Sequence, residues 1–167
     1  MMRACPILLL LLLCACSAAT EGSGPSEGSS PETREPRDLR VERLAAGAPG
    51  EGPQRPRIVL APSAEALSGE LGAEIPGSGE GTYLVAYRGE RPTGGYSIGV
   101  AGARVEGERV TVRITLGGPP SDAIVTQALS YPYVISLVEG LDPSGKEFSF
   151  VDADGERLDW PVRRVGG

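Results

Sequence analysis

The sequence predicts a mainly β protein: an antiparallel β-sandwich or barrel-like domain with one short packed helix, preceded by a disordered tether. Three observations support this fold class. Several short segments after residue 57 alternate apolar and polar residues with a period of two, which is typical of strands that bury one face. Segments rich in glycine and proline separate them, as expected for turns between short strands. One segment carries apolar residues at the four-residue spacing of a helix.

Residues 1–15 are predicted to be a lipoprotein signal peptide. Arg3 supplies a positive charge, and residues 7–13 form an aliphatic run shorter than the roughly 20 residues that a membrane-spanning helix needs. The run ends in the motif L-C-A-C, which resembles the lipobox of bacterial lipoproteins. The resemblance implies cleavage after Ala15 and lipidation of Cys16 by a diacylglycerol, with acyl chains such as palmitate. The alternative is an ordinary secretory signal that is cleaved near residues 17–19 and releases a soluble protein.

Lipidation predicts attachment to the cell envelope, because two or more acyl chains hold a protein stably at a membrane. Ser17 follows the modified cysteine, which favours the outer membrane if the host has two membranes. Cys5 and Cys14 leave with the signal, so the mature protein is predicted to have neither a free thiol nor a disulfide.

Residues 16–56 are predicted to form the lipidated cysteine and a disordered linker. The segment is rich in Gly, Ser, Pro and Glu and has few large apolar residues, so it cannot bury enough surface to offset the entropy lost on ordering. Leu39, Val41 and Leu44 predict at most a passing helical turn, since glycines and prolines after residue 46 interrupt any continuation.

Residues 57–167 are predicted to be the single β-rich domain. A short strand at residues 58–60 is followed by a helix with Ser63 as its N-cap and Glu65 in its first turn. The apolar stripe of this helix consists of Leu67, Leu71 and Ile75, and Pro76-Gly77 is expected to end it.

The remaining elements are predicted strands. Residues 82–88 are expected to form a central strand, and Tyr96, Ile98 and Val100 should share one face of the next. The clearest alternation is at residues 109–116, with Val110, Val112, Ile114 and Leu116 inward, after a hairpin turn at residues 106–108. Further strands are predicted at residues 124–129, 133–138, 148–151 and 157–160.

The composition excludes several kinds of chemistry. There is no histidine, so a histidine-based catalytic triad, a histidine base or a histidine metal site is not possible. Asp152 and Asp154 lack the further oxygen ligands of a calcium loop, and Asp154-Gly155 is better interpreted as a hairpin turn. The formal charge of −6 argues against nucleic acid as a ligand. The sequence therefore predicts a protein that is not an enzyme and holds no cofactor or metal.

Two aromatic and proline-rich segments are the candidate partner-binding site. The segment G-E-R-P-T-G-G-Y at residues 89–96 lies between two predicted strands, and Y-P-Y at residues 131–133 opens another. Arginine and tyrosine are frequent anchors of protein interfaces. The alternative is that both segments serve only as turn and core. The candidate residues are Arg91, Pro92, Thr93, Gly94, Gly95, Tyr96, Tyr131, Pro132 and Tyr133.

These two segments, in this order, resemble the PrcB C-terminal-type domain over roughly residues 58–138. That family is named for a lipoprotein subunit of a surface protease complex, so the resemblance implies an accessory role beside an envelope protease and supplies no catalytic residue. A fainter likeness is to chagasin-type cysteine-protease inhibitors, whose P-T-x-G-Y loop enters a protease cleft. Pro92, Thr93, Gly95 and Tyr96 match that pattern, whereas Arg91 replaces the usual Asn.

The predicted function is a binding or accessory module, anchored to a membrane by lipid, for an envelope protein such as a subunit of a protease complex. The alternatives are a chagasin-like protease inhibitor and a structural envelope lipoprotein without a dedicated partner.

Overall fold

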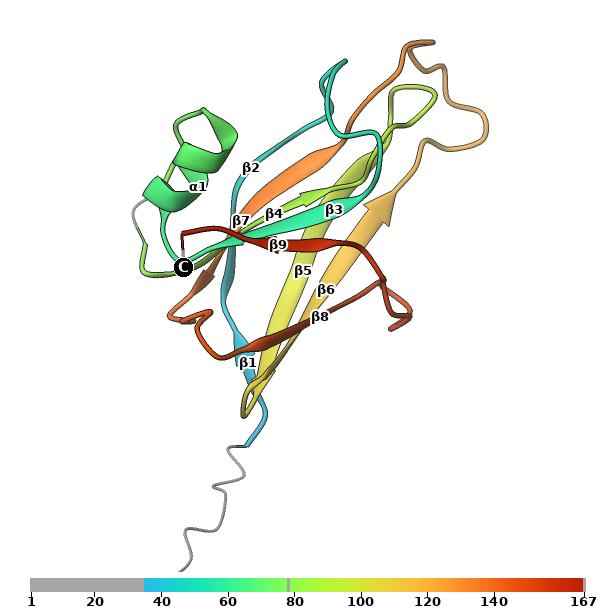
Figure 1. Ribbon diagram of the computed structural model, residues 1–167. Helices are drawn as coiled ribbons and strands as arrows, with labels where there is room; N and C mark the ends of the chain where they lie inside the picture. Colours follow the sequence, from blue (N-terminus) through green and yellow to red (C-terminus); the bar gives the residue numbers. More distant parts are fainter. Residues whose placement is uncertain (1–34, 78, 167) are drawn as a thin grey trace, which may run out of the picture. The chain divides into compact units, whose positions relative to one another are not determined.

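The computed structural model describes residues 35–77 and 79–166, and within them the chain forms one helix and nine strands in two sheets (Figure 1). One sheet has four strands in the order β1-β5-β6-β8, and the other has five in the order β2-β7-β4-β3-β9. The elements are β1 (Arg37–Leu39), β2 (Val41–Gly47), β3 (Arg57–Ala61), α1 (Ala64–Leu71), β4 (Gly81–Tyr87), β5 (Ser97–Glu106), β6 (Arg109–Gly117), β7 (Tyr133–Glu139), β8 (Glu147–Val151) and β9 (Val162–Arg164).

The two sheets pack face to face, so the fold is a sandwich. The core between them draws aliphatic side chains from strands of both sheets, among them Ile58, Leu84 and Val134 from the five-stranded sheet and Val112 and Ile114 from the other. Complete burial of such a side chain contributes about 1.5–3 kcal/mol. This core holds the strand ends, and hence the loops that follow them, in fixed positions.

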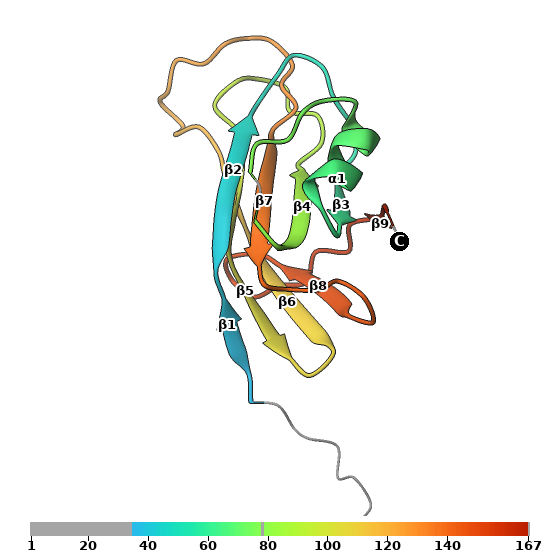
Figure 2. The ribbon, with the colours of Figure 1, turned by 90° about the vertical axis from the view of Figure 1, so that its left-hand side faces the viewer.

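Helix α1 covers the outer face of the five-stranded sheet (Figure 2). Ser63 caps it as predicted, accepting a hydrogen bond of 3.2 Å from the backbone N–H of Ala66. Leu67 is buried, but the helix ends at Gly72, whose left-handed φ of 65° closes the last turn. The predicted extension to Ile75 was therefore wrong, although Ile75 is buried beside the helix and its N–H donates to Ser68 Oγ at 3.1 Å.

The mainly β prediction with one short helix is confirmed, and β3, β4, β6, β7 and β8 lie where the sequence predicts strands. β4 is the central strand of its sheet, between β7 and β3. On β6, Val110, Val112 and Ile114 are buried as predicted. Leu116 is 39 % exposed instead, because the strand continues past the core toward the loops.

The expectation of purely antiparallel sheets was wrong at two pairs. β6 pairs with β8 in parallel, and so does β3 with β9. The first pair follows from the path of the chain, since β7 returns in the other sheet and β8 then runs in the same direction as β6.

The linker prediction for residues 16–56 was wrong for residues 37–47, which form β1 and β2. β1 pairs with the end of β5, and after Arg40 the chain crosses to the other sheet, where β2 pairs with β7. Leu39 belongs to the core, and a register shift between Arg43 and Ala45 breaks the alternation that would have revealed a strand. Residues 1–34, with the predicted signal peptide and Cys16, lie outside the described residues.

The predictions of strands at residues 124–129 and 157–160 were also wrong. Residues 124–129 form an irregular loop, and residues 157–160 make only an isolated bridge between Arg157 and Val151. The predicted turn at Asp154-Gly155 is confirmed, with Gly155 at a φ of 88°. No helix within residues 35–77 and 79–166 is long and apolar enough to cross a membrane.

Candidate functional site

Loops 88–96 and 118–132 meet at one end of the sandwich, next to the connection of residues 48–56 (Figure 1). We call this end the apex and these two segments the apex loops. Strand β5 runs from the apex, where Ser97 pairs with Gly117, to the opposite end, where Glu106 pairs with Arg109. Ten strand residues span about 30 Å, so the two ends of the domain are well separated.

The apex loops are joined through their backbones. Arg91 and Ser130 exchange hydrogen bonds of 2.8 and 3.0 Å, and Gly94 N–H donates to the carbonyl of Thr126 at 3.0 Å. The hydroxyl of Ser130 donates to the carbonyl of Thr93 at 2.6 Å. The two segments singled out in the sequence therefore form one structural unit.

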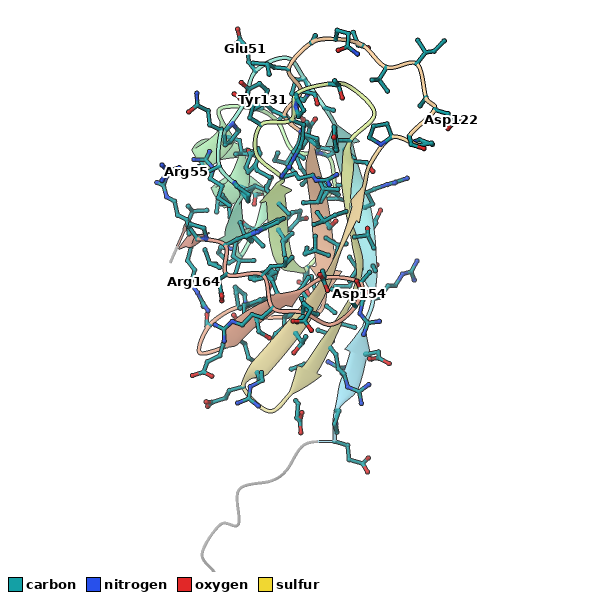
Figure 3. All side chains as sticks on the ribbon, turned by 90° about the vertical axis from the view of Figure 1, so that its right-hand side faces the viewer. Glu51, Arg55, Asp122, Tyr131, Asp154 and Arg164 are labelled. Atoms are coloured by element: carbon teal, nitrogen blue, oxygen red, sulfur yellow. The ribbon has the colours of Figure 1, made fainter. Side chains whose placement is uncertain are left out.

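Tyr131 and Pro132 lie inside this unit. Tyr131 is 8 % exposed; its hydroxyl donates to Glu90 Oε2 at 2.7 Å and its N–H to the carbonyl of Pro49 at 2.9 Å (Figure 3). The bond to the Glu90 carboxylate is the main cause that raises the pKa of the Tyr131 phenol. Pro132 is buried, and its carbonyl accepts a hydrogen bond from Arg88 N–H at 2.9 Å. These two candidate residues position the loops rather than present a contact surface.

Tyr133 begins β7 and belongs to the cluster on the outer face of the five-stranded sheet. The centroids of the Tyr133 and Tyr87 rings are 6.3 Å apart. The Cζ atom of Arg57 lies 5.1 Å from the centroid of the Tyr87 ring. Burial raises the pKa of the Tyr87 phenol. Tyr133 thus lies with Tyr87 and α1, on a different face from Tyr96.

Tyr96 stands beside two arginines. The Cζ atoms of Arg88 and Arg91 lie 5.0 and 5.9 Å from the centroid of its ring. Arg88 Nη1 donates to the carbonyl of Ser97 at 2.9 Å and to that of Gly117, so it ties together the apex ends of β5 and β6. Arg91 Nη2 donates to the carbonyl of Arg88 at 3.1 Å. Both arginines and the tyrosine are half-buried.

The turn of the first apex loop needs glycine at one position. Gly95 has a φ of 84°, and a Cβ there would lie 2.9 Å from Pro119 Cβ. Gly94 is half-buried against Thr126, and Thr93 donates its hydroxyl to the carbonyl of Gly94 at 3.2 Å, a contact within the turn. Pro92 and Gly95 are exposed, so the tip of this loop is accessible to a partner.

The sequence reasoning missed the exposed apolar residues of the second apex loop. Ile124 is fully exposed and Leu129 is 49 % exposed, although the sequence predicts a strand at residues 124–129. Leu116, at the end of β6 that leads into this loop, is 39 % exposed. Asp122 stands at the far tip of the same loop (Figure 3). An apolar segment that is long enough for a strand but has no alternation was the signal that could have identified this surface.

The described part of the chain contains no group of three or more His, Cys, Asp or Glu side chains that could hold a metal ion. A groove of about 530 Å³ lies on the outer face of the four-stranded sheet, lined by residues of β1, β5, β6 and β8 that include Arg104 and its ion-pair partner Asp38. No residue of either apex loop lines this groove.

The family model described as PrcB C-terminal matches residues 82–139. The matched segment begins in β4 and ends with β7, so it contains both apex loops and the strands that carry them. The resemblance to a PrcB C-terminal-type domain is confirmed over these residues. No curated protein and no solved structure matches the chain.

Proposed function

We propose that this protein is a lipid-anchored, non-catalytic accessory module of a bacterial cell envelope, and that it binds a protein partner, a protease or its complex, through the apex loops. The observation that carries the proposal is the match to the PrcB C-terminal family, which covers both loops. In that segment Leu116, Ile124 and Leu129 leave large apolar side chains open to solvent.

The exposed apolar residues support binding because they are grouped. Single apolar residues on a surface are normal, but contiguous ones mark contact sites. Of the four large apolar residues that are exposed among the described residues, Ile124 and Leu129 lie in the second apex loop and Leu116 lies at the end of β6 that leads into it. The fourth is Val162 in β9. The backbone bonds between the apex loops hold this surface in place, which reduces the entropy lost on binding.

The direction of the domain also fits an anchored module. The first described strand, β1, pairs Arg37 with Val105, next to the β5–β6 turn at Gly107. The chain therefore enters the domain at the end opposite the apex. A tether from Cys16 would therefore join the domain at the end opposite the apex loops and leave them accessible to a partner.

The test is capture of the tagged, lipidated protein from its own envelope, followed by mass spectrometry. The informative variant is Ile124→Ser with Leu129→Ser, and the matched control is Val162→Ser, which removes a similarly exposed apolar side chain from β9. A protease captured in fixed ratio by the wild type and the control, but lost with the apex variant, supports the proposal. A partner retained equally by all three proteins contradicts the assignment of the apex.

Inhibition of a cysteine protease is the second candidate function. In its favour, the tip of the loop with Pro92 and Gly95 is exposed on a rigid sandwich, which suits insertion into a cleft. The expected result is tight inhibition of a papain-like protease by the purified protein. The absence of inhibition across a broad panel of such enzymes would remove this candidate and leave the accessory function unaffected.

A further inference from the structure

Two cationic side chains share one aromatic ring at the apex. Arg88, the residue after β4, and Arg91 both belong to the first apex loop, and both guanidinium groups lie within 6 Å of the Tyr96 ring centroid, at 5.0 and 5.9 Å. A tyrosine ring attracts each cation, but it carries no charge that would neutralise either of them.

Neither arginine forms an ion pair within residues 35–77 and 79–166. Their hydrogen bonds go to backbone carbonyl oxygens, and the Nε atoms of both are buried without a partner. Glu90 lies between the two arginines in the sequence, but its carboxylate accepts a hydrogen bond from the hydroxyl of Tyr131. Burial and the neighbouring Arg91 lower the pKa of the Arg88 guanidinium, as expected for two like charges that are partly removed from water.

Two neighbouring guanidinium groups without an acidic partner repel each other, and a bound anion would neutralise this repulsion. A carboxylate suits the pair, because a guanidinium binds both oxygens through parallel N–H groups. The Nη2 atom of Arg88 and the Nη1 atom of Arg91 make none of the hydrogen bonds found among the described side chains, so they remain as donors. At the same end of the domain, the exposed side chains of Leu116 and Leu129 are apolar.

We propose that the apex binds an acidic segment of its protein partner, with an Asp or Glu carboxylate received by Arg88 and Arg91 beside Tyr96 and a flanking aliphatic residue placed against Leu116 or Leu129. This inference rests on the proposed function and specifies the chemistry of the partner. Arg88 also holds the ends of β5 and β6, so it positions the site as well as completing it.

The test uses two synthetic peptides and the full chain. One peptide has the sequence Gly-Leu-Asp-Leu-Glu-Gly, and the other replaces Asp by Asn and Glu by Gln. Binding is followed by the NMR shifts of the arginine Nε–H groups and of the backbone amides of loop 88–96. We expect the acidic peptide to bind about tenfold more tightly, since hydrogen bonds to charged groups are the stronger ones. The shifts should be centred on Arg91 and Tyr96.

Variants separate charge from folding. Arg91→Gln should abolish the preference for the acidic peptide. Arg113→Gln, on the exposed outer face of β6, should keep it. If Arg91→Gln fails to fold, Arg91→Lys can be used instead. It retains the charge but lacks the planar guanidinium that binds both carboxylate oxygens, so it should keep a reduced preference for the acidic peptide. Equal binding of the two peptides, or an unchanged preference in Arg91→Gln, would overturn the inference.

Two further outcomes discriminate between explanations. Shifts at Arg91 with vesicles containing phosphatidylglycerol, and none with the acidic peptide, would assign the pair to a membrane surface and overturn the inference. A natural partner that is lost with the Ile124/Leu129 variant but retained by Arg91→Gln would also overturn it, while leaving the proposed function in place.

Discussion

Arg91 and Ser130 exchange two backbone hydrogen bonds, of 2.8 and 3.0 Å, between loops that are far apart in the sequence. This isolated bridge extends the contact between β4 and β7 beyond the ends of the strands and into the apex. The apex loops therefore move as one unit, and a change in one loop should be detected in the other.

Ser130→Ala tests this coupling. Ser130 is 4 % exposed, and its hydroxyl bond to the carbonyl of Thr93 is 2.6 Å long. Its loss should cost about 1 kcal/mol of unfolding free energy. Amide exchange at Arg91 and Gly94 should become faster, although neither residue is changed. Ser144→Ala, at an exposed position, is the control and should lie within about 0.5 kcal/mol of the wild type. Unchanged exchange in Ser130→Ala would show that the backbone bridge alone fixes the loop.

Gly95→Ala tests whether the apex needs both a left-handed backbone and a close approach. The φ angles of Gly95 and Gly155 are nearly equal, at 84° and 88°, so the conformational cost of alanine, about 1–2 kcal/mol, should be similar at the two sites. Only at Gly95 would the new Cβ meet Pro119, at 2.9 Å, whereas at Gly155 it meets nothing within 4 Å. Urea denaturation should therefore show a larger loss for Gly95→Ala. Equal losses would mean that Pro119 moves aside without cost.

Strong alternation made several elements predictable from the sequence. β6 alternates buried valine and isoleucine with polar residues over most of its length, and this apolar face is enough to identify the segment as a strand. The loop at residues 124–129 misled because apolar residues are usually buried. Here the connection from one sheet to the other leaves Ile124 and Leu129 in solvent.

The candidate site was only partly predictable for a related reason. The sequence identified the segment at residues 89–96 as a candidate loop, but the need for glycine at position 95 is seen only in the structure. No sequence pattern shows that Tyr131 points inward to Glu90 while Tyr133 points to the helix-covered face. Those directions depend on which strands become neighbours, and strand order is set by long-range packing rather than by local periodicity.

Leu39→Ala tests the correction at the N-terminus of the domain. As part of β1, Leu39 packs into the core with 9 % exposure, so the substitution should lower the unfolding free energy by about 2–3 kcal/mol. In a disordered linker the same substitution would have no effect. Pro36→Ala, at an exposed position before the strand, is the control. Identical urea midpoints for both variants would argue that β1 is detached in solution.

Alkaline pH should destabilise the domain through its tyrosines. Burial raises the pKa of Tyr83 and Tyr87, and the bond to Glu90 raises that of Tyr131, all from the ordinary value of about 10. Above that pH the unfolded chain loses protons that the folded protein retains, so stability is complete below about pH 10 and falls as the pH rises through the folded values. Urea midpoints should therefore decrease as the pH rises above about 10. Tyr131→Phe should reduce this decrease, and an unchanged slope would contradict the role of Glu90.

Cys16→Ser tests the anchor on which the proposed function depends. Without the thiol no thioether to diacylglycerol can form, so the variant should incorporate no labelled palmitate and should leave the membrane fraction. Cys14→Ser is the matched control, because Cys14 is predicted to be removed with the signal peptide. The variant would carry no acyl chain, so complete loss of lipid anchoring is expected rather than a partial shift. Labelling that persists in Cys16→Ser but disappears in Cys14→Ser would move the lipidation site. Labelling absent from the wild type would instead favour a secreted protein cleaved near residues 17–19, whose apex loops would then have to find their partner without a membrane to hold them beside it.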